Sequence, residues 1–253
     1  MRHNRARILP VLFFSLAGMF SIPIAKDALP YIRAGIVTRR LTNLAVEPKP
    51  KEKPDVTPLD TQINFEELWK VNQDIIGWIC IPGTQVNYAI LQSRADDNFY
   101  LSHTPEKEEN ILGAIFIYRK FSPDFTDQNT IIFGHNMRSG QMFGELSNYR
   151  EEAFWTQHPY VYIYTPQKAM RCLIYSAYTC EVTDKTFIVG YEAASKEYQA
   201  FLVYTKEKSV IKTDVIPAAA DRIVTLSTCT DGGYASQRFV VNCVPDEIKA
   251  IKQ

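Results

Sequence analysis

Eight short segments rich in β-branched and aromatic residues constrain the fold of this chain more than any other feature. Turn-forming residues separate these segments, and few long helical patterns lie between them. This pattern favours a mainly β fold, a closed antiparallel or mixed β-barrel of about eight strands, over a doubly wound sheet. The predicted strands are 78–81, 86–91, 114–118, 130–133, 160–164, 171–179, 222–227 and 238–244.

Three helices are predicted beside these strands. Asn64 is an N-cap residue, and Glu67 completes a capping box for a helix that ends at Gly77. Apolar residues recur at helical spacing in that segment and indicate core packing. A second helix is predicted near residues 142–154. A longer one over 191–208 is inserted before the strand that leads to Cys229.

The first 62 residues have a different composition from the rest. Arginines precede an apolar run over 8–25, which is long enough for the ~17–25 residues that cross a bilayer. We therefore predict a cytoplasmic tail at 1–7 and a single transmembrane signal anchor at 8–25, with the rest of the chain outside the cell. A cleaved signal peptide is the alternative, but no clean Ala-x-Ala site follows the run.

Residues 26–62 are predicted to form a stem and a linker. The stretch up to Leu44 is mixed and suits a short helix, whereas 47–58 is rich in Pro and Lys and cannot bury a core. Residues 63–253, about 190 in number, then have the size of one domain. The net charge of zero, without a basic cluster, argues against nucleic acid as a partner.

The five cysteines leave at least one thiol unpaired in an exported protein that forms no intermolecular disulfide. Cys80, Cys172 and Cys243 lie in apolar runs and are predicted to be small buried hydrophobes. A Cys172–Cys180 disulfide would join two positions too far apart along one strand. No Cys-x-x-Cys or His-rich spacing suggests zinc, and we predict no metal and no cofactor.

Cys229, His135 and Arg238 are the candidate catalytic residues. The run that contains Thr225 ends on Cys229, the next run begins with Arg238, and His135 follows another run and a glycine. A thiol of pKa ~8.5 forms little thiolate at neutral pH, but an imidazolium nearby would lower that value and later protonate a leaving amine. The guanidinium would stabilise an oxyanion. The alternative is that each residue has only a structural role.

The other histidines are weaker candidates. His3 precedes the predicted membrane segment, His103 lies in a polar loop, and His158 precedes Pro159 beside a predicted helix end, which indicates a structural role.

The stretch from Thr225 to Cys229, Thr-Leu-Ser-Thr-Cys, resembles the signature of the sortases, cysteine transpeptidases of the Gram-positive cell surface. The resemblance covers roughly residues 63–244 and is closest to class B. It rests also on segments 77–84, 129–137, 142–143, 158–159 and 209–214. It implies a sortase barrel in which a helix is inserted before the cysteine strand.

The resemblance also implies the activity and partners. Cys229 would attack a Thr–Gly or Thr–Asn carbonyl in the C-terminal sorting signal of a surface protein. His135 would protonate the departing amine, and a peptidoglycan cross-bridge amine would resolve the thioester. Five residues would contact substrate, either because they align with a family pocket or groove or because they flank the cysteine: Leu101, Phe187, Ile188, Ser227 and Thr228.

Three alternatives stay open at this stage. A pilus-polymerising sortase would use a pilin lysine as acceptor, but the Asp-Pro motif of the usual pilus enzymes is missing, and Lys53-Pro54-Asp55 has the reverse order. A papain-like protease is disfavoured because His135 precedes Cys229. In a membrane-tethered binding module, Cys229 would be only a buried thiol.

Overall fold

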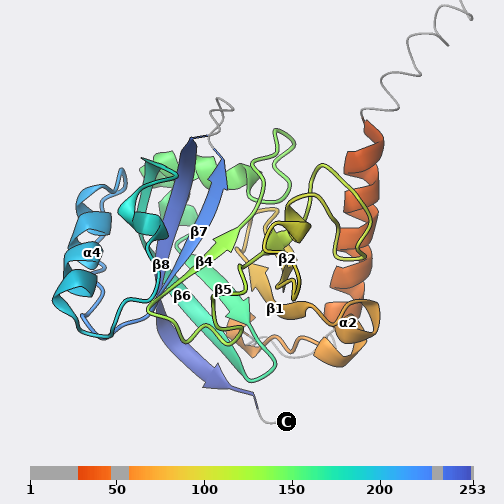
Figure 1. The fold of residues 1–253 in the computed structure, drawn as a ribbon, viewed down its shortest axis with the longest axis horizontal. Helices are drawn as coiled ribbons and strands as arrows, with labels where there is room; N and C mark the ends of the chain where they lie inside the picture. The colour runs from red at the N-terminus through yellow and green to blue at the C-terminus, as the bar shows by residue number, and fades with distance from the viewer. Residues whose placement is uncertain (1–27, 47–56, 230–235, 252–253) are drawn as a thin grey trace, which may run out of the picture.

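The computed structural model describes residues 28–46, 57–229 and 236–251. In this part of the chain, eight strands close into one barrel in the order β1-β2-β3-β4-β7-β8-β6-β5 (Figure 1). The pairs β2–β3 and β4–β7 are parallel and the others antiparallel. The predicted mixed barrel is therefore confirmed. The strands are β1 (Ile75–Cys80), β2 (Asn87–Leu91), β3 (Ile115–Phe116), β4 (Asn129–Phe133), β5 (Tyr160–Tyr164), β6 (Lys168–Glu181), β7 (Ile223–Cys229) and β8 (Gln237–Ala250).

The helix predicted from Asn64 is shorter than expected. α2 spans Phe65–Val71, and β1 begins already at Ile75, opposite Leu91 of β2. The Asn64 cap is confirmed, since its Oδ1 accepts from Glu67 N at 3.1 Å. The capping box does not form, because Asn64 N donates to the Ala45 carbonyl at 2.9 Å and Glu67 pairs with Lys70.

The helix predicted near residues 142–154 is divided into two. A 3-10 helix, η3 (Gly144–Arg150), and the short α3 (Glu152–Gln157) are separated by the extended backbone of Glu151. The predicted insertion before the cysteine strand is confirmed as α4 (Lys196–Glu207), which is capped by the Ser195 side chain. Its first predicted turn is missing, and Ala194 there has a φ of 57°. Further 3-10 turns are η1 (Pro58–Asp60), η2 (Phe99–Leu101) and η4 (Lys185–Phe187).

A helix over residues 28–45 packs along the barrel, on the flank opposite α4 (Figure 1). Ala34, Val37, Leu41 and Ala45 are buried at helical spacing and form its inner face. We call it the N-terminal helix, and it agrees with the helical stem that the sequence predicts. In the described part of the chain no helix has the length and apolarity of a membrane span; the predicted anchor at 8–25 lies outside that part.

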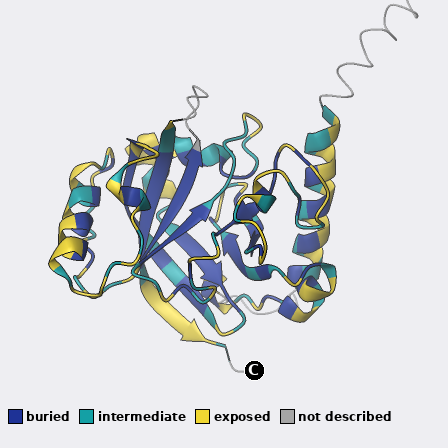
Figure 2. Ribbon diagram, viewed as in Figure 1, coloured by how far each residue is buried: buried dark blue, intermediate teal, exposed yellow. Residues whose placement is uncertain are grey.

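The N-terminal helix also holds the loop that follows η2. Its Pro30 carbonyl accepts from Asn110 Nδ2 at 3.0 Å, and Arg40 pairs with Glu106 at 2.8 Å. The strands of the barrel are largely buried (Figure 2), and Ile132 of β4 lies fully buried in the main hydrophobic cluster. Burying each such side chain stabilises the fold by about 1.5–3 kcal/mol. The barrel is therefore a rigid support for the residues at its ends.

Candidate active site

Three adjacent strands bring the three candidate catalytic positions to one end of the barrel. β4 and β7 run parallel with Phe133 opposite Ser227, and Gly134 N continues this ladder to the Ser227 carbonyl at 3.2 Å. His135 and Cys229 each follow two residues later. β8 pairs antiparallel with β7 and places Arg238 opposite Cys229. The predicted Cys, His and Arg positions thus lie at the same end of three adjacent strands, and Cys229 and Arg238 are directly paired.

The backbone around His135 is tightly packed. A Cβ on Gly134 would lie 2.5 Å from Ile115 Cδ1 and 2.8 Å from the Phe143 ring, so the chain approaches both closely only because this residue is glycine. Phe143 N also donates to the His135 carbonyl at 2.9 Å. These contacts fix the strand end from which the imidazole projects.

The His135 side chain is hydrogen-bonded to the backbone of Leu101. Its Nε2 lies 2.7 Å from the Leu101 carbonyl oxygen, and the Leu101 side chain is 46% exposed. The sequence pointed to Leu101 as a substrate-contacting side chain. The structure brings it to the site and adds a backbone contact with the candidate general acid.

Arg238 is half-buried at the start of β8, where its Nη1 donates to the Gln237 carbonyl at 2.8 Å. Its charge also acts on Tyr118. Burial raises the pKa of Tyr118, and the Arg238 guanidinium partly opposes this rise. The Tyr118 ring stacks on Phe133 at 4.5 Å, next to the strand end that carries His135. Sequence reasoning missed Tyr118, although its place at the end of a predicted strand was a signal.

Ser227 and Thr228 lie in β7 directly before Cys229, and both are buried. Neither hydroxyl has a hydrogen-bond partner among the described residues. A buried hydroxyl without a partner costs roughly 1–3 kcal/mol. Each hydroxyl could therefore form a further hydrogen bond beside the candidate nucleophile.

Phe187 is the last residue of η4, and Ile188 follows it as the C-cap. Phe187 is half-buried and packs on a small cluster that includes Cys180 and Val240, on the β6–β8 pair. Ile188 is 50% exposed and borders a hollow of about 540 Å³ between η4 and α4. The structure thus brings Phe187 toward the site and leaves Ile188 open to solvent.

Asp184 anchors this turn and was not singled out by the sequence. Its carboxylate accepts from Thr186 N at 3.0 Å and Thr186 Oγ1 at 2.7 Å, and also from Tyr204 OH. Lys208 Nζ lies 3.2 Å away. Burial raises the pKa of Asp184, but the hydrogen bonds from Tyr204 and Thr186 outweigh it and hold that pKa below its ordinary value. This Asp184 cluster joins η4 to α4.

The other four cysteines are free thiols in the described part of the chain. Cys172 and Cys243 are fully buried, as predicted, and no Cys172–Cys180 disulfide forms. Burial raises the pKa of Cys80 to about 11 and that of Cys180 to about 12. These thiols stay protonated at neutral pH and are poor nucleophiles.

The remaining candidates have structural contacts. His158 Nδ1 lies 2.8 Å from the Pro82 carbonyl, which confirms its structural role, and His103 stacks on Phe99. No group of three or more His, Cys, Asp or Glu able to hold a metal is found among the described residues.

Comparison with known proteins identifies the family. The family model described as "Sortase domain" matches residues 79–246. "Sortase B" of Listeria monocytogenes is 35% identical over 178 residues, which cover 70% of this chain and 72% of that protein. The Staphylococcus aureus sortase B–substrate complex is similar with a TM-score of 0.67 and 34% identity, covering 74% of this chain and 85% of that one. Sortase B of B. anthracis, in complex with AAEK1, gives a TM-score of 0.72 and 31% identity, covering 86% and 98%.

Proposed function

This chain belongs to the sortase family and is a cysteine transpeptidase of class B, and from this premise we propose that Cys229, His135 and Arg238 carry its reaction. The observation that supports the assignment best is the register of β4, β7 and β8, which brings these three positions to one end of adjacent strands. The four other thiols are less suitable, because burial keeps those of Cys80, Cys180 and Cys243 protonated and Cys172 is fully buried.

In the first half-reaction the Cys229 thiolate attacks the carbonyl carbon of the scissile peptide bond. The tetrahedral intermediate collapses to a thioester as the C–N bond breaks, and His135 gives its proton to the leaving amine. In the second half-reaction an acceptor amine attacks the thioester and loses a proton to His135. A new amide forms and the thiolate is restored.

Arg238 stabilises the negative charge that develops on the carbonyl oxygen. A guanidinium is always charged and presents a fixed fork of donors, so it acts as an electrostatic partner and not as a base. Its half-buried position strengthens this interaction relative to bulk water.

The donor substrate is the C-terminal sorting signal of a surface protein, and the acceptor is a peptidoglycan cross-bridge amine. The substrate complex of the S. aureus relative supports a bound donor peptide. Leu101, Phe187 and Ile188 contact the donor, and the unpartnered hydroxyls of Ser227 and Thr228 supply polar contacts beside the thioester. The apolar run at 8–25 anchors the enzyme in the cell membrane by a single pass with its catalytic domain outside.

The test is to incubate the full chain with a library of sorting-signal peptides and an oligoglycine amine, and to read the products by mass spectrometry. We expect cleavage and transfer to the amine, and complete loss of both in Cys229→Ala. We expect Arg238→Ala to lower turnover by about 10²- to 10³-fold while the fold survives.

Turnover by Cys229→Ala at the wild-type rate would exclude the assigned nucleophile. Cleavage without transfer to oligoglycine, followed by transfer to a lysine side-chain amine, would replace the cross-bridge acceptor with a pilin-type acceptor.

A further inference from the structure

The His135–Leu101 hydrogen bond determines which imidazole nitrogen carries a proton. A carbonyl oxygen can only accept, so Nε2, which lies 2.7 Å from the Leu101 oxygen, must be the donor. In the neutral ring the lone pair is then on Nδ1, and Nδ1 is left to exchange a proton with the thiol. A backbone carbonyl would thus have the orienting role that a carboxylate has in Ser-His-Asp triads.

The Leu101 carbonyl is held by close backbone packing. Leu101 N donates to the Asn98 carbonyl and Ala114 N to the Tyr100 carbonyl, each at 2.9 Å. Gly113 has a φ of +56°, and a Cβ there would lie 2.6 Å from the Leu101 oxygen. The exposed Leu101 side chain contributes little to this anchoring. The position of the Leu101 carbonyl therefore depends on the residues that precede Leu101 and on those that pack against it.

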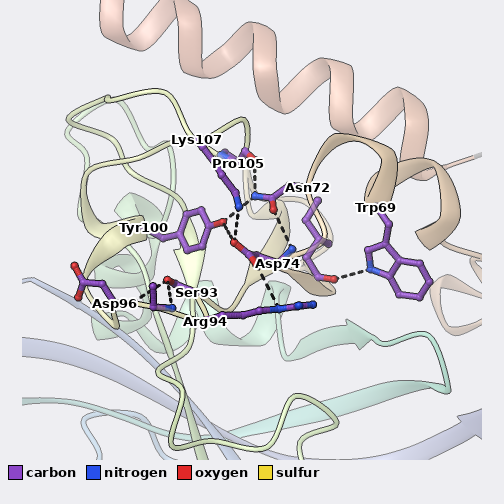
Figure 3. Close-up of polar contacts among 11 residues, drawn as sticks. Trp69, Asn72, Asp74, Ser93, Arg94, Asp96, Tyr100, Pro105 and Lys107 are labelled. Atoms are coloured by element: carbon purple, nitrogen blue, oxygen red, sulfur yellow. Dashed lines mark hydrogen bonds and ion pairs between the residues drawn. The ribbon is translucent and has the colours of Figure 1, made fainter.

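Tyr100, the preceding residue, is fully buried and is the anchor of this segment. Its hydroxyl donates to Asp74 Oδ2 at 2.7 Å and accepts from Asn72 Nδ2 at 2.8 Å (Figure 3). Asn72 Nδ2 also donates to the Pro105 carbonyl at 2.8 Å, and Lys107 Nζ lies 3.0 Å from Asp74 Oδ2. The phenol is thus satisfied as both donor and acceptor by the turn between α2 and β1. We call Tyr100, Asp74, Asn72 and Lys107 the Asp74 cluster.

The charged groups of this cluster strengthen the hydrogen bond that holds Tyr100. Burial raises the pKa of Asp74, but the Tyr100 hydrogen bond and the Lys107 ammonium outweigh it and hold that pKa below its ordinary value. A hydrogen bond to an ionised carboxylate is stronger than one between neutral groups. In the part of the chain that the structure describes, no hydrogen bond or ion pair joins a side chain of the cluster directly to His135. The cluster therefore acts on His135 through the backbone from Tyr100 to the Leu101 carbonyl.

We propose that the Asp74 cluster positions the Leu101 carbonyl, and that this carbonyl holds His135 with its proton on Nε2. The inference rests on the proposed function, because it assigns an orienting partner to the general acid of that reaction. Tyr100, Asp74 and Asn72 are positioning residues, since they act on His135 through the Leu101 carbonyl.

The test compares Tyr100→Phe with Tyr164→Phe in the full chain. Tyr164 is a matched control: it is also buried, and its hydroxyl donates to the Pro58 carbonyl at 2.6 Å, in η1. We expect both variants to lower the unfolding midpoint by about 2–4 °C. We expect only Tyr100→Phe to lower the single-turnover acylation rate, by about tenfold, because a small displacement of a catalytic group costs such factors.

A direct readout is the tautomer of His135, from long-range ¹⁵N–¹H spectra of histidine-labelled protein assigned with His135→Gln. In the wild type we expect the neutral ring to be protonated on Nε2. Tyr100→Phe should produce a mixture of tautomers, and Tyr164→Phe should leave the spectrum unchanged. This measurement needs no turnover, so it tests the positioning device even if no peptide is cleaved and the proposed function fails.

Two results would overturn the inference. One is a wild-type His135 protonated on Nδ1 in the neutral ring. The other is a Tyr100→Phe variant that matches Tyr164→Phe in both acylation rate and spectrum. The first needs only the wild-type protein, so the test stands even if a variant does not fold.

Discussion

The Asp74 and Asp184 clusters have nearly the same chemistry but support different parts of the site. In each, a mostly buried aspartate accepts from a tyrosine hydroxyl and pairs with a lysine, with side-chain exposures of 12% for Asp74 and 8% for Asp184. The first holds the segment whose carbonyl contacts His135. The second holds the turn that ends in Phe187. The same arrangement is therefore expected to affect acid–base chemistry in one place and peptide binding in the other.

The difference lies in what each cluster anchors and not in its strength. A carbonyl that orients an imidazole influences the transition state, where proton transfer depends on geometry. An apolar side chain beside a groove contributes similarly in the bound and transition states. Loss of the orienting carbonyl lowers the maximal rate. Loss of the apolar side chain raises the peptide concentration that is needed to reach the maximal rate.

Asp74→Ala should produce the largest effect. It removes the acceptor of the Tyr100 hydroxyl and the partner of Lys107. The rate of acylation at saturating peptide should fall by about 10- to 100-fold, and the free energy of unfolding by about 1–3 kcal/mol. Single-turnover kinetics with denaturant titration measure both. A control is Asp246→Ala, which loses only a surface pair with Arg171 at the far end of β6 and β8. A higher half-saturating peptide concentration, without a fall in the acylation rate at saturation, would contradict the comparison.

Asp184→Ala should have the complementary and smaller effect. Without its carboxylate, η4 loses its cap and its bond to Tyr204, so Phe187 is less well placed. We expect the half-saturating peptide concentration to rise about fivefold, the equivalent of about 1 kcal/mol. The saturating rate should stay within about twofold. A large fall in that rate with unchanged half-saturation would show that both clusters act on the chemistry.

The strands and the three catalytic candidates could be predicted from the sequence because their signals are local. β-branched runs mark β4, β7 and β8, and Cys229 and Arg238 are adjacent to such runs. The boundary between α2 and β1 could not be predicted. Ile75 continues the helical spacing of apolar residues, yet pairing with Leu91 draws it into the barrel. Tertiary hydrogen bonds overrode the local preference there.

The two aspartate clusters lay beyond sequence reasoning for a different reason. Asp74 and Tyr100 are 26 positions apart, and Asp184 and Tyr204 are 20 apart. No local pattern pairs such residues. The Leu101 contact is harder still, because the group that binds His135 is a backbone carbonyl, which every residue has. Only the assembled barrel shows which carbonyl faces the imidazole.

The acid limit of stability should depend on both clusters. The pKa values of Asp74 and Asp184 are held below the ordinary value of 3.8 in the folded protein. Their stabilisation is therefore fully present above about pH 3.8 and is lost as pH falls through the folded values. Asp74→Asn and Asp184→Asn should each flatten the fall in unfolding free energy below about pH 4. Denaturant titrations from pH 7 to 2 measure this pH dependence of the free energy of unfolding. An unchanged slope in both variants would show that neither carboxylate is stabilised by folding.

The smallest expected effect is the coupling between the two clusters. They share no residue, so the effects of Tyr100→Phe and Tyr204→Phe on the free energy of unfolding should add to within about 0.5 kcal/mol. The same additivity should hold for acylation, with the Tyr100 effect on the maximal rate and the Tyr204 effect on half-saturation. A double-mutant cycle measures the deviation. A coupling well above that value would mean that the groove segment and the His135 support move together, and that the separation into rate and binding roles is wrong.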